Sequence, residues 1–184
     1  MKRPRGNPLH LSPDPAELFA QFSPADDLPQ YQVLVPHEVP PPYDGLLVHE
    51  YHMTVTVEAF HGDLVDVRPL VVRHDGDLYS RKIVLSLRGS GKVVLFGIVR
   101  VNLALCSQAV RDEIVAQKTP FGRVLIKHNV MRRIEPTGFF RIDSGPKQME
   151  WFGLSELKPL YGRVAFIRCD GVRAVELFEV VAPE

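Results

Sequence analysis

One arginine lies in a segment whose pattern places it among hydrophobic side chains. Residues 77–87, DLYSRKIVLSL, alternate as a β-strand does, and every second side chain of a strand faces the same side. Arg81 therefore shares a face with Ile83, Leu85 and Leu87, whereas the other face carries Lys82 and Arg88 among its residues. A guanidinium stays charged and offers two parallel donors to a carboxylate. Its place on a dry face indicates a site for an anionic ligand.

A glutamate stands alone in the last segment of the chain in the same way. There, Glu176 shares one face of the expected strand with Ala174, Phe178 and Val180. The other face carries both Arg173 and Glu179, so we expect that second face to reach water. A carboxyl group on an apolar face beside a ligand can donate or accept a proton.

A glycine falls next to the predicted position of the arginine. In a symmetric hairpin around RGSG, Ile83 lies opposite Gly97 and Leu85 opposite Leu95, which makes Gly97 a diagonal neighbour of Arg81. Glycine within a strand lowers stability and often marks a close approach of a ligand. A buried salt bridge between Arg81 and Glu176, with no ligand, explains the two charges equally well, and periodicity alone leaves both interpretations open.

The elements that must position these residues are hairpins with helices between them. The pattern predicts a helix within 47–63, ending at Gly62, and two strands around the turn HDGD. It predicts a further strand over 92–103, an amphipathic helix over 107–117 and a short helix near Pro120. A strand at 138–145 and a hairpin with its turn at CDG complete the chain. This order indicates an α+β fold with one antiparallel sheet and helices on one face.

Composition limits the class of protein. Lys plus Arg and Asp plus Glu number 22 each, which gives no argument for nucleic acid or an anionic membrane. No apolar run approaches a bilayer span, the N-terminus has no secretory pattern, and two cysteines make no disulfide framework. We therefore expect a cytoplasmic protein. Ten of 16 prolines precede residue 43, which indicates an N-terminal arm over 1–42 and one folded domain over 43–184. The arm is expected to be extended apart from a short helix at PAELFAQF.

Several short segments together resemble the chorismate lyase family. They are YSRKIVLSL, TPFGRVL, LYGRVAFIRCDG and VELFEVV, in that order, and HMTVTVEAFHGD is similar to the cyanobacterial and mycobacterial branch. The resemblance covers roughly residues 45–182. It implies a sheet of about six antiparallel strands, an enclosed pocket and a monomer. It also implies a chorismate pyruvate-lyase, which forms 4-hydroxybenzoate and pyruvate without a metal or cofactor.

The resemblance also implies roles for single residues. Arg81 matches the arginine that binds the ring carboxylate, and Glu176 the glutamate that faces the ring hydroxyl. Met53 and Phe121 match positions whose backbone N–H groups meet that carboxylate, and Arg133 matches a further basic residue near the pocket. The chain departs from the family where Ile98 follows Gly97 in place of an arginine, and where the segment IEPTGFFRI is longer.

The sequence is compatible with two other interpretations. The same fold serves as a non-catalytic binding module for small molecules in some bacterial transcription regulators, but an arm of 42 proline-rich residues is too short for their DNA-binding domain. A stand-alone protein that binds an aromatic acid without catalysis therefore remains the alternative to the lyase. A metal site is suggested by His49, Glu50 and His52, but their spacing fits no tight zinc pattern.

Overall fold

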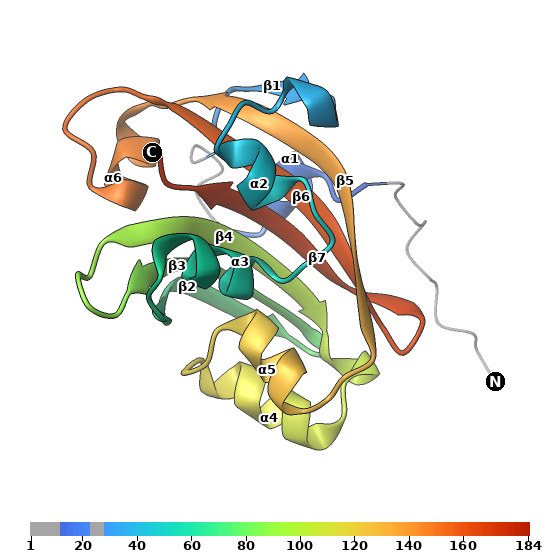
Figure 1. The fold of residues 1–184 in the computed structure, drawn as a ribbon. Helices are drawn as coiled ribbons and strands as arrows, with labels where there is room; N and C mark the ends of the chain where they lie inside the picture. Colours follow the sequence, from blue (N-terminus) through green and yellow to red (C-terminus); the bar gives the residue numbers. More distant parts are fainter. Residues whose placement is uncertain (1–11, 23–27) are drawn as a thin grey trace.

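A computed structural model describes residues 12–22 and 28–184. Over these residues the chain forms seven strands in a single antiparallel sheet of order β1-β5-β6-β7-β4-β3-β2 (Figure 1). The strands are β1 (Tyr31–Leu34), β2 (Val65–Asp75), β3 (Leu78–Leu87), β4 (Val93–Asn102), β5 (Arg132–Asp143), β6 (Pro159–Cys169) and β7 (Val172–Val181).

Six α-helices accompany the sheet in the described part of the chain. They are α1 (Pro15–Ala20), α2 (Tyr43–Leu47), α3 (Met53–His61), α4 (Gln108–Ala116), α5 (Phe121–Lys127) and α6 (Pro146–Phe152), with 3-10 turns at Pro36–Glu38 and Leu103–Leu105. Helix α3 ends at Gly62 in the left-handed conformation, and Ser107 caps α4 through its side chain, both as predicted.

The hairpin register agrees with the prediction around Gly97. Strands β3 and β4 pair Leu85 with Leu95, Ile83 with Gly97, and Arg81 with Val99. Arg81 and Gly97 are therefore diagonal neighbours on one face of the sheet. Strand β7 lies on the other side of β4 and places Glu179 opposite Gly97.

Helices cover both faces of the sheet, whereas the sequence pattern predicted one covered face. The sheet has seven strands in the described residues, where the family resemblance implied about six. On one face, Phe19 of α1 and Trp151 of α6 pack against Phe96 of β4 and Phe178 of β7. On the other face lie α2, α3, α4 and α5, with Met53 of α3 in the same core cluster as Ile83, Leu85 and Leu95. Helices α4 and α5 lie together at one end of the sheet (Figure 1).

Part of the proline-rich segment belongs to the folded body. Leu18, Phe19 and Phe22 are almost fully buried, because α1 packs its apolar side on the sheet. Strand β1 pairs with β5 and forms one edge of the sheet. The packing therefore does not change at residue 43, where the sequence indicated the start of the domain. No helix in the described residues is long and apolar enough to cross a membrane.

Candidate ligand-binding site

A pocket lies between the sheet and the N-terminal ends of α3 and α5. Its volume, as the space open to the centres of water molecules, is about 40 Å³, which is room for roughly three waters. The walls come from β2, β3, β4, β5, β6, β7 and both helices, and most are apolar. The polar and glycine positions in the lining are His52, Thr54, Arg81, Gly97, Gly122, Arg163 and Glu179.

Arg81 projects into this pocket and lacks partners for part of its guanidinium. The residue is 1% exposed. Its Nη2 donates to the carbonyl of Thr119 at 3.3 Å, but among the described residues neither Nε nor Nη1 has a hydrogen-bond partner. Burial lowers the pKa of Arg81 from its ordinary value, as expected where a charge is removed from water. Buried donors without partners are rare in native proteins, so this arrangement indicates a place for an acceptor from outside the chain.

The carboxylate in the pocket is Glu179, and a second buried arginine binds it. Arg163 is fully buried and its Nε donates to Glu179 at 2.8 Å. The same guanidinium donates to the carbonyls of Leu47, His49 and Tyr51 at 3.1, 2.9 and 3.2 Å. Arg163 therefore has a set of acceptors, whereas Arg81 keeps an unmatched positive charge beside the pocket.

Glu176 does not share the pocket with Arg81, contrary to the expectation from the sequence. It lies opposite Arg100 in the β4–β7 pairing and forms an ion pair with that arginine. Both side chains belong to the face that carries Phe178 and Val180, on the far side of the sheet from Arg81. The carboxylate that lines the pocket is that of Glu179, where the sequence had indicated Glu176.

An irregularity in the β6–β7 pairing explains why the sequence pattern selected the wrong glutamate. Alternation placed Arg173 with Glu179, and two charges on one face indicated a wet surface. The register shifts between Ile167 and Arg168, so strict alternation does not extend to Arg173. Its guanidinium instead lies 4.1 Å from the ring centroid of Phe166 and bonds to Glu135. Glu179 was missed for a second reason, since Arg163 comes from a neighbouring strand that local periodicity does not register.

Of the residues predicted to bind a ligand, four line the pocket and one does not. Arg81, Gly97, Met53 and Phe121 all lie in the lining, the last two as the first residues of α3 and α5. Arg133 points outward: its side chain is 67% exposed and lies 3.9 Å from Glu50. Its neighbour Arg132, which composition alone indicated to be solvated, is the arginine that reaches the pocket wall through His52.

His52 forms a wall between the pocket and the outer surface. Arg132 donates from Nε to His52 Nε2 at 2.5 Å, and both residues also line an apolar surface groove beside α3. Burial, together with the charges of Arg132 and Arg163, lowers the pKa of His52 to about 4. His52 is therefore neutral near pH 7. A side chain on Gly122 would place its Cβ 3.1–3.2 Å from the His52 ring, so the glycine lets α5 approach this wall.

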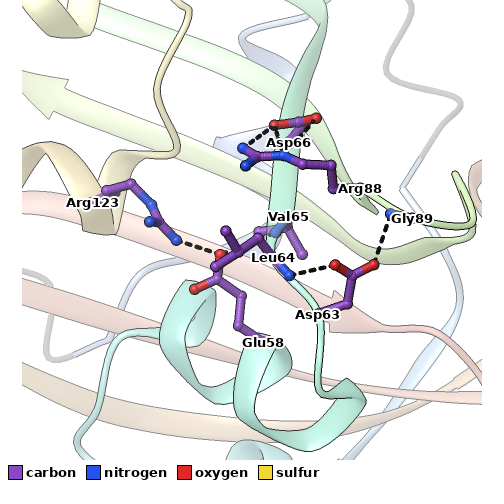
Figure 2. A network of polar contacts seen from close by, with 8 residues as sticks. All are labelled: Glu58, Asp63, Leu64, Val65, Asp66, Arg88, Gly89 and Arg123. Carbon is purple, nitrogen blue, oxygen red and sulfur yellow. Dashed lines mark hydrogen bonds and ion pairs between the residues drawn. The ribbon is translucent and has the colours of Figure 1, made fainter.

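Polar contacts connect α3 to α5 and to the adjoining strand β2 (Figure 2). Arg123 of α5 forms an ion pair with Glu58 of α3, and Glu58 also accepts from the Val65 backbone N–H at 3.0 Å. Asp63 accepts from the Gly89 backbone N–H at 2.8 Å and connects this corner to the β3–β4 turn (Figure 2). These contacts hold the two helices over the pocket.

Comparisons with known proteins show the fold. No family model matches the sequence, and no curated protein matches it. The structure is similar to the ligand-binding domain of a protein assigned to the GntR family of transcriptional regulators from Bordetella bronchiseptica. The TM-score is 0.50 at 13% identity, covering 65% of this chain and 86% of that one. It is also similar to PhnF from Mycobacterium smegmatis, with a TM-score of 0.51 at 12% identity, covering 71% and 63%. The expected α+β, chorismate lyase-like fold is thereby confirmed.

Proposed function

We propose that the protein binds a small cyclic carboxylic acid in the pocket, with the acid's carboxylate at Arg81. The observation that carries this proposal is the buried guanidinium of Arg81, whose Nε and Nη1 have no partner among the described residues. A carboxylate is an acceptor with two oxygens and a negative charge, so it satisfies both the unmatched donors and the unmatched charge. The apolar walls suit the body of a ring.

The proposed reaction on that ligand is the elimination of pyruvate from chorismate. The bond between the ring and the ether oxygen breaks, the ring loses a proton, and the released enolpyruvate gains a proton to become pyruvate. Aromatisation of the ring drives the step. The protein needs to hold the substrate in an eliminating geometry and to manage one proton, which are the roles of Arg81 and Glu179.

The positions of the two residues support this assignment. Arg81 pairs with Val99, and Glu179 pairs with Gly97 from the other side of β4. The two residues are thus separated by two inter-strand spacings across the sheet and by two residue positions along the strands. This corresponds to about 12 Å between their Cα atoms. Both side chains reach inward across Gly97, which has no side chain to fill the space. A six-membered ring with one substituent toward each residue spans this gap.

A non-catalytic binding protein is the second candidate, and two observations favour it. Water-molecule centres have only about 40 Å³, so a substrate with a ring and an enolpyruvyl group requires α3 and α5 to move outward. Glu179 is already bound by Arg163, which restrains its use as a base. The likeness to the ligand-binding domain of a regulator points the same way, although only at the level of fold.

Incubation of the purified protein with chorismate separates the two candidates. Formation of 4-hydroxybenzoate and pyruvate in equal amounts, above a protein-free blank, supports the lyase. Tight binding of 4-hydroxybenzoate with no product above the blank supports the binding protein. Failure to bind any small cyclic carboxylic acid contradicts both.

A further inference from the structure

The unpaired polar atoms of the protein are concentrated at one place on β3. Among the described residues, the buried side-chain nitrogens and oxygens without a hydrogen-bond partner are Nε and Nη1 of Arg81 and the hydroxyl oxygen of Tyr79. The two residues are separated by one position and face the same side of the sheet. Each is 1% exposed. Three unpaired atoms in adjacent side chains are poorly explained by chance, because nearly all buried polar groups are paired.

The Tyr79 hydroxyl interacts with the guanidinium of Arg81 from behind the pocket lining, but the contact is not a well-formed hydrogen bond. Burial raises the pKa of Tyr79, and the charge of the neighbouring Arg81 partly offsets that rise. A cation next to a hydroxyl favours the oxygen facing the charge, which turns the O–H bond away from it. The tyrosine ring itself is fixed, because it packs in the core cluster with Val101 and Phe121. The hydroxyl is thus a positioned donor.

We infer that Tyr79 and Arg81 together bind the ligand's carboxylate, with the Tyr79 hydroxyl donating a hydrogen bond to one of its oxygens. This inference rests on the proposed function and names a specificity-determining residue for that site. An ionised carboxylate accepts hydrogen bonds and donates none, so a site built from donors selects it. A carboxamide of the same shape places an NH₂ group against one of these donors and leaves it unpaired, which disfavours binding.

The alternative is that Tyr79 serves only as an imperfect partner of Arg81 within the fold. The two roles differ in what the loss of the hydroxyl does. If the hydroxyl supports Arg81 in the unliganded protein, its removal lowers stability. If it awaits a ligand, its removal leaves stability unchanged or higher, since a buried unpaired group is lost, and the cost falls on binding.

The test compares wild type with Tyr79→Phe, using Tyr161→Phe as the matched control. Tyr161 lies on β6 and stacks on Tyr43, with ring centroids 4.5 Å apart, whereas Tyr79 neighbours Arg81 on β3. Calorimetric titration with 4-hydroxybenzoate and with 4-hydroxybenzamide measures affinity, and thermal unfolding without ligand measures stability. We expect Tyr79→Phe to weaken 4-hydroxybenzoate binding about tenfold to a hundredfold, the range for a hydrogen bond to a charged group. We expect its preference for the acid over the amide to shrink, its melting temperature to stay level or rise, and Tyr161→Phe to bind as wild type.

Every outcome decides the matter. If the wild-type protein binds 4-hydroxybenzoate and Tyr79→Phe binds it with the same affinity, the role of Tyr79 is overturned and the proposed function stands. A lower melting temperature with unchanged affinity assigns Tyr79 to the fold alone, which also overturns it. If the wild-type protein binds neither 4-hydroxybenzoate nor chorismate, the proposed function fails together with the inference that rests on it.

Discussion

Replacing Arg81 by methionine should stabilise the unliganded protein, although it removes a large buried side chain. Each buried donor without a partner costs about 1–3 kcal/mol, so Nε and Nη1 together cost about 2–6 kcal/mol. The substitution also loses the 3.3 Å bond to Thr119, worth about 1 kcal/mol, and leaves a small void that costs about as much. The expected net gain is about 2 kcal/mol, which raises the melting temperature by about 4–8 °C for a chain of this length.

Arg163→Met is the matched control, because its guanidinium is equally buried but has acceptors. Removal of Arg163 leaves Glu179 without its partner, and breaking such a buried pair costs about 3–5 kcal/mol. Urea unfolding measures both variants through the fluorescence of Trp151, the single tryptophan, which stacks on Phe96 with ring centroids 3.7 Å apart. The two variants should shift stability in opposite directions. If Arg81→Met loses stability as Arg163→Met does, Arg81 is satisfied within the fold and the argument for a ligand there is refuted.

Three further outcomes follow from the same geometry. If the protein is a lyase, Glu179→Gln should lower chorismate turnover about 10²- to 10⁴-fold while Glu176→Gln, on the other face of the sheet, turns over as wild type. Gly97→Ala should fold as well as wild type, since its Cβ meets its nearest neighbours at 3.4–3.6 Å, but it should weaken binding of 4-hydroxybenzoate because the pocket becomes narrower. Gly162→Ala should instead destabilise the fold, because its Cβ would lie 2.6 Å from the carbonyl oxygen of Glu179. The unfolding free energy should fall by up to about 3 kcal/mol as the pH drops from 6.5 to 4. The reason is that His52 binds a proton with its ordinary pKa of 6.5 in the unfolded chain but with a pKa of about 4 in the folded protein. Urea titrations across this pH range should show that His52→Gln removes this part of the fall.

Local patterns in the sequence were sufficient to locate Arg81 and its surroundings. Alternation within β3 assigns the face of Arg81. The short turn between β3 and β4 fixes the strand register, and with it the pairing of Ile83 with Gly97. The helix that carries Met53 and the one that begins at Phe121 were recognisable from their spacing and from the residues at their ends. Each of these features depends on residues close together in the chain.

Local sequence patterns could not identify Glu179 as the acidic residue of the site, because its surroundings come from strands that are distant in the sequence. The buried carboxylate of Glu179 is paired with Arg163 of β6, and Arg163 also donates to a carbonyl of the segment before α3. The register shift near Ile167 also breaks the alternation on which the choice of Glu176 depended. Arg133 was selected over Arg132 by the resemblance to the family motif, whereas in the structure Arg132 binds His52 and Arg133 is exposed.

The second layer of helices was also not apparent from the sequence. The proline-rich segment suggested an arm, since proline removes backbone donors and disfavours regular structure. Its short helix α1 nevertheless buries Leu18, Phe19 and Phe22 against the sheet. Three large apolar residues within five positions are a burial signal that the proline content obscured.

The most direct test of the carboxylate site is a crystal structure of the protein with 4-hydroxybenzoate bound. We predict the carboxylate within hydrogen-bond distance of Arg81, about 2.7–2.9 Å from its guanidinium nitrogens, with the ring over Gly97 and its hydroxyl toward Glu179. A structure in which the pocket stays closed and the acid binds elsewhere, for example beside Arg132 in the outer groove, would contradict the assignment of this pocket.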